Sequence, residues 1–469
     1  MAFEPTFFWY DLETSGRDPR RHRIMQFAGR RTTLDLQPVG EPVNQLVRLA
    51  DDVLPEPQAA LITGLTPQAT AGGLTEAELV KFLHAEVLTP GTIMVGFNNI
   101  RFDDEHLRYT FYRSFHDPYA WCYKDGRSRW DLLDVVRFTR AMRPDGLEWP
   151  RDDNDDPINT LAELAKVNRL KHLKAHDALS DVDALIGVAG LIKTAQPRLW
   201  QYLFNARGKD GVLSVIKPHA PEPFVYANGM YGRQHDFTTV GVLIGDDGAG
   251  AYYVYDLRVD PAPFLNLTPA ELSLRLFTKR EELEAAGLTR VPVKTLRVNK
   301  CPAVAPLSTL TPDAAARLQL DVATIKQHWQ VLRQGSLVEN IAKAYAAQPP
   351  FTPSGDVDAA LYDNFINEDA ACAQVRAADE RTIGQLAPRF QDPRLPELLT
   401  RYKARNFPDA GFSDTERQQW EAYRTARILA DIEPWSNELH DCYFQAGPAG
   451  QALLTDLQLW AESIYPAEI

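Results

Sequence analysis

The sequence has few cysteines, no long apolar run and no basic excess. Its four cysteines are scattered without paired spacing, which fits a reducing compartment and excludes a thiolate metal site. There is no run of about 18 apolar residues, so we expect no membrane span. The N-terminus lacks the basic stretch and apolar core of a secretory signal. Together these absences predict a cytoplasmic protein.

Acidic residues outnumber basic ones, 63 against 50, which gives a formal net charge of −13. Generic nucleic-acid binders usually carry a basic excess. The total charge therefore argues against that class, although an acidic protein can still line one channel with Lys and Arg. A length of 469 residues predicts roughly three domains.

The order of predicted elements divides the chain into three regions. We predict a mixed α/β domain at 5–195, a β-rich domain at 197–350 and an all-α domain at 353–469, separated by proline-containing breaks. Short apolar or alternating runs predict strands at 7–10, 24–33, 42–49, 93–97, 212–216, 224–227, 237–244, 251–257 and 295–298. Helical spacing predicts helices at 79–88, 104–115, 131–142, 160–167, 178–194, 361–380, 393–405, 415–429 and 451–464.

Two acids, Asp11 and Glu13, follow the first predicted strand. Residues two apart on an extended chain point to the same face, so these carboxylates lie together. Their repulsion must be offset, and a divalent cation such as Mg²⁺ prefers oxygen ligands. The alternative for this pair taken alone is a solvated acidic turn.

Two further segments carry acids at the ends of predicted elements. Asp103 and Asp104 open a helix after the strand at 93–97, where capping alone would explain an acid. His176 and Asp181 are five residues apart and cannot share one helix face. We therefore expect His176 on the loop before a helix and Asp181 within its first turns, although a surface histidine beside capping acids is the simpler alternative.

Taken together, these acids and the histidine match the requirements of two-metal phosphodiester hydrolysis. Two cations about 3.5–4 Å apart would clamp the attacking and leaving oxygens. Asp11 would bridge them, and Glu13 and Asp181 would complete the shells with one acid of the 103–104 pair. His176, with an ordinary pKa near 6.5, suits a general base that takes a proton from the attacking water.

The motifs D-L-E-T-S-G, N-N-I-R-F-D and H-D-A-L-S-D resemble the three exonuclease motifs of the DEDD superfamily, and the His-x4-Asp spacing resembles its histidine branch. The resemblance continues along almost the whole chain and is to the bacterial exonuclease I family. Segments that carry it include D-P-Y-A-W at 117–121, S-R-W-D-L-L-D-V at 128–135, N-K-C-P at 299–302, F-T-P-S at 351–354 and R-Y-K-A-R-N-F-P at 401–408. The motif match selects Asp103, not Asp104, as the metal ligand.

This resemblance implies a ribonuclease-H-like exonuclease domain at 5–195, an SH3-like domain at 197–350 and a helical C-terminal domain at 353–469. It implies Mg²⁺-dependent removal of 5′-mononucleotides from the 3′ end of single-stranded DNA, in DNA repair and recombination. Two Mg²⁺ ions are expected, with Mn²⁺ as a substitute. The implied partner is the C-terminal tail of single-stranded DNA-binding protein, and we expect a monomer.

Substrate contacts are predicted from residue type. Glu13 and Thr14 would approach the terminal nucleotide beside the metals. One departure from the family pattern is Thr160, near which an arginine is expected. A basic groove and stacked aromatic rings are typical of single-strand binding. The candidates for the groove are Arg101, Arg113, Arg129 and residues 401–405, and the basic run 17–23 is expected to be a solvated loop near the site. The candidates for stacking are Tyr112, Tyr119, Trp121 and Trp130, although packing in the core is the favoured role for each aromatic taken singly.

Two alternatives stay open. One is an exoribonuclease or proofreading-type exonuclease of the same superfamily, although such proteins are usually shorter and would not need residues 197–469. The other is a catalytically silent scaffold that binds single-stranded DNA. A silent scaffold predicts the loss of an acid or of the histidine, and all five residues are present.

Overall fold

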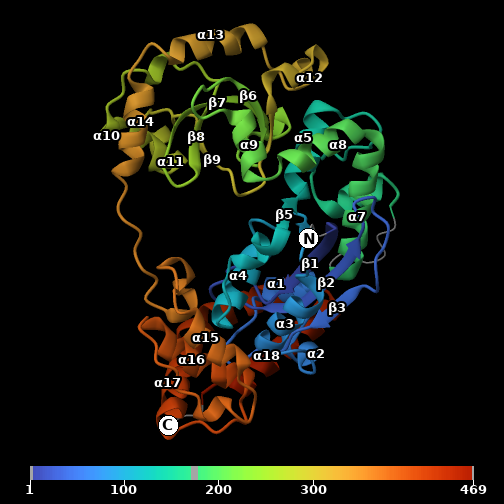
Figure 1. The fold of residues 1–469 in the computed structure, drawn as a ribbon, viewed down its shortest axis with the longest axis vertical. Helices are drawn as coiled ribbons and strands as arrows, with labels where there is room; N and C mark the ends of the chain where they lie inside the picture. Colours follow the sequence, from blue (N-terminus) through green and yellow to red (C-terminus); the bar gives the residue numbers. More distant parts are fainter. Residues whose placement is uncertain (1–3, 171–177, 467–469) are drawn as a thin grey trace. The chain divides into compact units, whose positions relative to one another are not determined.

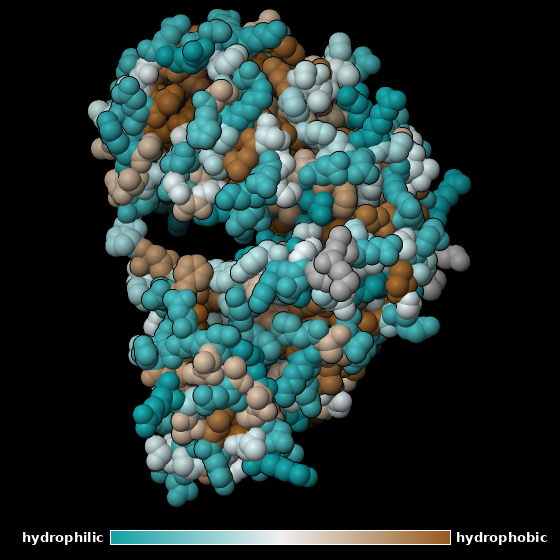
Figure 2. Space-filling model, viewed as in Figure 1, coloured by the Kyte–Doolittle hydropathy of each residue, from teal (hydrophilic) through white to brown (hydrophobic). Residues whose placement is uncertain are grey.

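The computed structural model describes residues 4–170 and 178–466, which form two compact units. The first unit contains residues 4–128, 178–183 and 351–466, and the second contains 129–170 and 184–350. Figure 1 follows the chain from the blue N-terminal strands to the red C-terminal helices. Polar side chains cover most of the face seen in Figure 2, with apolar patches between them. No helix within the two described ranges is long and apolar enough to cross a membrane.

The sheet of the first unit begins with the predicted antiparallel meander. Strands β1 (Thr6–Thr14), β2 (Ile24–Thr32) and β3 (Val43–Leu46) are joined by β4 (Thr92–Gly96), which runs parallel to β1, in the order β3-β2-β1-β4. β1 is longer than predicted because its pairing with β2 continues through Glu13, opposite Gln26. The two carboxylates therefore lie within the strand and not after it.

One face of β1 packs against helices. Phe8, Tyr10 and Leu12 alternate along the strand and enter an apolar core with Leu107 and Phe111. The helices that cover this core are α3 (Glu76–Phe82) with the π-helical turn η1 (Leu83–Val87), and α4 (Asp103–Arg113). Period-two alternation sends the opposite parity, including Asp11 and Glu13, to the other face of the sheet.

The C-terminal part of the first unit is helical. Its helices are α15 (Asp369–Ala377), α16 (Arg394–Asn406), α17 (Asp414–Gln445) and α18 (Pro448–Ile464), with short helices α1 (Pro57–Thr63), α2 (Pro67–Thr70), η2 (Ala120–Cys122), η3 (Lys124–Gly126), η7 (Val357–Tyr362) and η8 (Ile383–Gln385) in the same unit. α17 and α18 pack against α1 around Trp435 and Leu457. α16 packs against α4 residues such as Tyr112 in a second core.

The second unit contains a five-stranded antiparallel sheet in the order β10-β6-β7-β8-β9. Its strands are β6 (Phe224–Ala227), β7 (Thr238–Asp246), β8 (Ala251–Asp256), β9 (Val293–Arg297) and β10 (Ala303–Pro306). Its helices are α5 (Leu132–Met142), α6 (Leu161–Val167), α8 (Pro197–Ala206), α9 (Lys209–Ile216), η4 (Arg233–His235), η5 (Ala262–Phe264), α10 (Pro269–Phe277), α11 (Arg280–Ala285), η6 (Leu307–Thr309), α12 (Pro312–Arg317), α13 (Val322–Leu332) and α14 (Leu337–Ala346). β5 (Ser128–Asp131) and α7 (Ala178–Ala195) span the boundaries between the units.

Three sequence predictions of elements are wrong. The run 212–216 is the end of helix α9, because Val212 and Ile216 are one helical turn apart and both are buried. The predicted helix 361–380 is divided into η7 and α15 by a stretch without regular structure. The predicted helix 415–429 continues to Gln445, with Pro434 inside it.

Candidate active site

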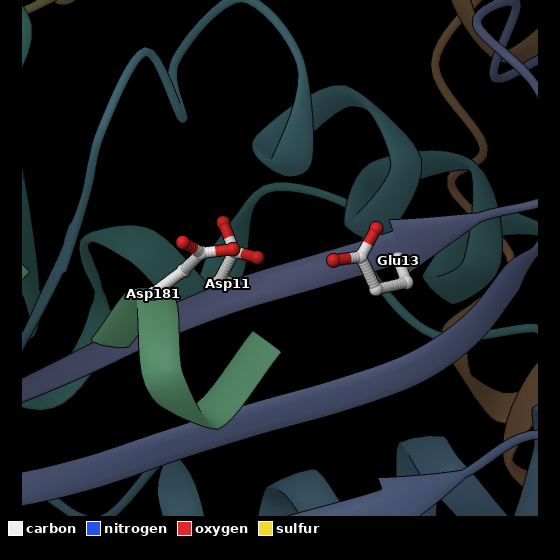
Figure 3. A group of neighbouring side chains, drawn as sticks. All are labelled: Asp11, Glu13 and Asp181. Carbon is white, nitrogen blue, oxygen red and sulfur yellow. The ribbon is translucent and has the colours of Figure 1, made fainter. Parts of the chain in front are cut away.

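Three of the predicted acids lie together in the first unit. Ligand oxygens of Asp11, Glu13 and Asp181 all lie within 4.8 Å of one another. Figure 3 shows Asp11 and Glu13 following each other along β1, while Asp181 reaches Asp11 from the first turns of α7. Glu13 is only 7% exposed, and the other two side chains are half-buried. Asp11 and Glu13 point to the same face of β1, and the first turns of α7 bring Asp181 to them. Residues 170 positions apart in the sequence thus meet at one site.

The electrostatics of this group favour a bound cation. Burial, followed by the charge of Asp181, raises the pKa of Asp11 well above its usual value. Both effects oppose the ionised form that a hard divalent cation requires as a ligand, and the cation's own charge reverses them. Three clustered carboxylates fit Mg²⁺ or a similar oxygen-seeking ion. The donor set therefore suits the metal chemistry expected from the sequence.

Asp103 begins α4, as predicted, and is 5% exposed. It is not a member of the group whose oxygens lie within 4.8 Å of one another. Its neighbour Asp104 is fully buried and accepts a 2.5 Å hydrogen bond from the Tyr10 hydroxyl. The Asp104 carboxylate is engaged in this contact, and the role of Asp103 as a metal ligand stays a prediction.

The other predicted site residues have different outcomes. His176 lies outside the described residues, so its role as general base stays a prediction. Thr14 is 6% exposed, and its hydroxyl donates to the carbonyl of Gly16 at 2.9 Å. This contact shapes the turn after β1, and the approach of Thr14 to a nucleotide stays a prediction.

The prediction that Arg113 and residues 401–405 line a cationic groove is wrong. Arg113, Arg401, Lys403 and Arg405 are only 3%, 5%, 2% and 7% exposed. Each forms ion pairs inside the first unit, with Glu76, Asp358, Glu416, and both Asp52 and Asp358 respectively. These cations stabilise the fold and are not available to phosphates.

The remaining cationic candidates differ in exposure. Arg101 is exposed, whereas Arg129 is 8% exposed and donates to the carbonyl of Asn299 at 2.8 Å. In the basic run 17–23, Arg17 and Arg20 are exposed but Arg23 is 2% exposed. The solvated loop expected there is therefore confirmed only for its first part.

Most of the predicted stacking residues are core residues. Tyr112, Trp121 and Trp130 are 2%, 1% and 1% exposed, so for these three the alternative role, packing in the core, is confirmed. Tyr119 is half-buried. Sequence reasoning missed two exposed rings, Tyr123 at 64% and Phe365 at 72%. No sequence signal separates these rings from the buried ones, because single aromatics in irregular segments carry no periodicity.

The departure at Thr160 lies at the start of α6 in the second unit. Thr160 occupies the N-cap without a side-chain cap. Next to it, Asn159 accepts a 3.1 Å hydrogen bond from Arg140, which also donates to the carbonyl of Ile158 at 3.0 Å. An arginine from α5 thus contacts this segment.

Three protein-family models match the chain in sequence order. They are Exonuclease at residues 8–189, the exonuclease I SH3-like domain at 207–347 and the exonuclease I C-terminal domain at 355–464. Exodeoxyribonuclease I of Escherichia coli K12 is 38% identical over 98% of both chains. The chain belongs to the exonuclease I family. It is therefore an exonuclease with the three-part domain architecture of this family.

Other relatives agree with this assignment. Exodeoxyribonuclease I of Haemophilus influenzae is 38% identical over 91% of this chain and 92% of its own. The structure of E. coli exonuclease I with a dA16 oligonucleotide has a TM-score of 0.93 at 37% identity and covers 98% of this chain and 100% of that one. A zinc-bound complex of E. coli exonuclease I with single-stranded DNA has a TM-score of 0.92 at 37% identity. An SSB/exonuclease I structure with an inhibitor has a TM-score of 0.89 at 35% identity. Both cover 98% of this chain and 100% of the matched chain.

Proposed function

We propose that the chain hydrolyses single-stranded DNA from its 3′ end and releases 5′-mononucleotides with the help of two Mg²⁺ ions. The observation that carries this proposal is the cluster of Asp11, Glu13 and Asp181 within 4.8 Å, in a chain that matches exonuclease I along its whole length. Bound Mg²⁺ would polarise the phosphodiester and lower the pKa of a metal-bound water.

In this proposal each protein group has a separate role. Asp11 would be the ligand shared by both ions, and Glu13, Asp103 and Asp181 would complete their ligands. His176 accepts the proton of the attacking water, because an imidazole with an ordinary pKa near 6.5 can act as a base at neutral pH. Glu13 and Thr14 contact the terminal nucleotide. Mn²⁺ should replace Mg²⁺ because it also binds carboxylate oxygens.

Exposed aromatic rings support single-stranded DNA as the substrate. Tyr119, Tyr123 and Phe365 line one pocket of about 420 Å³ in the first unit. The rings of Tyr119 and Phe365 lie 5.9 Å apart, and the guanidinium of Arg108 lies 5.5 Å from the Tyr119 ring. Bases of any sequence can stack on such rings, typically with about 1–3 kcal/mol per base. We propose that this pocket holds bases of the bound strand.

Digestion of 3′-labelled substrates tests the activity. Single-stranded DNA, duplex DNA and RNA are compared with Mg²⁺ and with EDTA. We expect release of mononucleotides from single-stranded DNA only, and none in EDTA. Equal degradation of RNA would favour the exoribonuclease alternative, and full activity in EDTA would contradict the metal mechanism.

Point substitutions test the ligands. Asp181→Ala should abolish turnover while leaving DNA binding largely intact. The matched control is Asp183→Ala, because Asp183 is on the same helix but is exposed and pairs with Arg30 at 2.9 Å. His176→Ala should slow hydrolysis without a comparable loss of Mn²⁺ affinity. A large fall in that affinity would make His176 a ligand and not a base.

A second pair of substitutions tests the stacking pocket. Phe365→Ala should raise the Kd for an oligonucleotide by roughly 5- to 150-fold, the equivalent of about 1–3 kcal/mol. Phe444→Ala is the control, because Phe444 is also 72% exposed but lies on α17 outside this pocket. Equal effects of the two substitutions would exclude a specific role for Phe365.

The remaining proposals rest on the family. We propose a monomer in the cytoplasm, with domain boundaries at 5–195, 197–350 and 353–469. We also propose that the chain binds the C-terminal tail of single-stranded DNA-binding protein, as suggested by the SSB/exonuclease I structure. Sedimentation measures the monomer, and fluorescence anisotropy of a tail peptide measures the binding. A scrambled peptide that binds equally well would contradict the partner.

A further inference from the structure

A buried polar network lies directly beneath the candidate metal site. The Tyr10 hydroxyl donates to Oδ1 of Asp104 at 2.5 Å. The Asn99 side-chain amide donates to both members of this pair, at 3.3 Å to the Tyr10 oxygen and 3.2 Å to Asp104 Oδ1. Tyr10, Asn99 and Asp104 are 1%, 0% and 0% exposed. The network is thus enclosed and linked by hydrogen bonds.

Each member of the network belongs to a different segment of the site. Tyr10 is on β1 next to Asp11, and Asn99 is in the turn that follows β4. Asp104 is in the first turn of α4 next to Asp103. The network therefore connects the strand that carries Asp11 to the helix that begins with Asp103.

The start of α4 depends on this connection. The N-cap residue, Phe102, makes no side-chain cap hydrogen bond. The backbone N–H of Asp104 instead donates to the carbonyl of Asn99 at 2.8 Å, and its side chain accepts from Tyr10 and Asn99. The first turn of the helix is thus fixed through Asp104 and not through a conventional cap.

Hydrophobic packing of the core alone would not favour the polar groups of Tyr10, Asn99 and Asp104 at these buried positions. Burying a carboxylate costs several kcal/mol unless its partners compensate for the lost hydration. An apolar side chain at position 104 would fill the same space without that cost. The hydrogen bonds that join the Tyr10 hydroxyl, the Asn99 amide nitrogen and the Asp104 carboxylate instead favour one arrangement of the segments that carry them.

We propose that Tyr10, Asn99 and Asp104 are positioning residues, which hold the Asp103-bearing turn against β1 so that the Asp103 carboxylate meets the metal bound by Asp11. This inference rests on the proposed function, in which Asp103 is a ligand. None of its three members is a proposed metal ligand, and the network acts by orienting one. Groups that orient metal ligands typically contribute about 10- to 100-fold in metal affinity or activity.

Tyr10→Phe is the central test, because it removes one hydroxyl and keeps the ring in the core. We expect the Kd for Mn²⁺, measured by electron paramagnetic resonance without DNA, to rise about 10- to 100-fold. The kcat should fall while the KM for single-stranded DNA stays close to that of the unsubstituted chain. The Mn²⁺ measurement does not depend on turnover and therefore reports on the ligands directly.

Tyr112→Phe is the matched control. Tyr112 is also on α4, is 2% exposed, and donates its hydroxyl to the carbonyl of Val357 at 2.8 Å. The Tyr112→Phe substitution deletes the hydroxyl of a similarly buried tyrosine at a position outside the site. It should therefore reduce stability with no change in Mn²⁺ affinity. If the two substitutions raise the Mn²⁺ Kd equally, or if neither raises it, the positioning role is excluded.

Substitutions of Asp104 and Asp103 distinguish a failure of the positioning role from a failure of the ligand assignment. Asp104→Asn keeps an oxygen acceptor for the Tyr10 hydroxyl and should retain much more Mn²⁺ affinity than Asp104→Ala. Equal affinity of these two variants would contradict the network. Asp103→Asn should lower the affinity at least as much as Tyr10→Phe. If Asp103→Asn has no effect, the ligand assignment in the proposed function fails, whereas an effect of Asp103→Asn without one of Tyr10→Phe refutes only the positioning role.

Discussion

Substituting Asp358 by alanine should destabilise the helical part of the first unit more than any surface charge change. Asp358 is in η7 and is fully buried. Its carboxylate accepts hydrogen bonds from Arg401 at 2.9 Å, from Arg405 at 2.8 Å and from the Tyr423 hydroxyl at 2.9 Å. These guanidiniums hold the pKa of Asp358 well below its usual value, even though burial alone would raise it.

The expected loss of stability depends on which acidic partners Arg401 and Arg405 keep after the substitution. Breaking a buried ion pair by removing one partner typically costs about 3–5 kcal/mol, because the other charge is left uncompensated. Arg405 keeps a second carboxylate, Asp52, at 2.7 Å. Arg401 keeps partners that are 44% and 56% exposed, Asp356 and Glu397. We therefore expect a loss near the lower end, about 3 kcal/mol in the free energy of opening.

Native-state hydrogen exchange of α16 and α17 amides measures this free energy locally. The control is Asp369→Ala, which removes a 2.8 Å ion pair with Arg376 whose acid is 91% exposed. Pairs of that kind contribute about 0–1 kcal/mol. Asp358→Asn, which keeps the shape, separates lost charge from lost packing. If Asp358→Ala and Asp369→Ala lower the opening free energy by the same small amount, the buried cluster does not stabilise these helices.

Three other predictions follow from the structure. Asp11→Asn should abolish turnover yet raise the thermal stability of the metal-free protein at pH 7, because the raised pKa of Asp11 means that its ionised form opposes folding above the ordinary carboxyl range; unchanged or lower stability in EDTA would contradict this. The pKa of Asp358 is lowered well below its usual value, so its stabilisation is fully present at neutral pH, begins to weaken as the pH falls below about 4 and is lost only as the pH falls through the lowered pKa; exchange of α16 amides at pH 7 and pH 3.5 should show the start of this loss. Gly29→Ala should cost about 1–3 kcal/mol by thermal denaturation, because a Cβ there would lie 2.3 Å from the Phe8 ring and 2.8 Å from the Trp9 carbonyl.

The sheet of the first unit could be predicted because its strands have unambiguous patterns. The apolar run at β1 is followed by acids of one parity, and the pairing of β1 with β2 keeps that parity through Glu13. The positions of Asp11 and Glu13 on one face therefore followed from alternation alone. The end of β1 could not be predicted, because it depends on pairing with β2 and not on its own residues.

The errors in the fold come from short apolar runs and from proline. Val212 and Ile216 fit a strand or a helix equally well over five residues, and packing of one face of α9 decides the outcome. β10 is four residues long and ends in Pro306, so its own residues do not predict a strand. Pro434 does not end α17, because the tertiary contacts of Trp435 on its far side hold the helix in place.

The site was predicted in part. The grouping of Asp181 with Asp11 followed from the requirements of two-metal hydrolysis and was supported by the family resemblance, since residues so distant in sequence have no local relationship. The role of Asp104 was missed because a second acid at a helix start is indistinguishable from a cap in the sequence. Arg401 and Arg405 are four residues apart on α16, and the sequence predicted both in a cationic groove that binds DNA. Their buried acid partners, Asp52 and Asp358, come from other segments that no sequence pattern links to them.

The buried cations change how the acidic balance of the chain relates to DNA binding. Arg23, Arg113, Arg140, Arg401, Lys403 and Arg405 are at most 7% exposed, so at least six of the 50 basic side chains cannot contact phosphate. A chain with a net charge of −13 offers no overall positive field to a polyanion. Binding of a single strand must therefore depend on local features: metal ions over the carboxylates, a few exposed cations, and stacking on rings that need no charge. Because a base of any identity can stack on an aromatic ring, this arrangement suits the binding of single strands of any sequence.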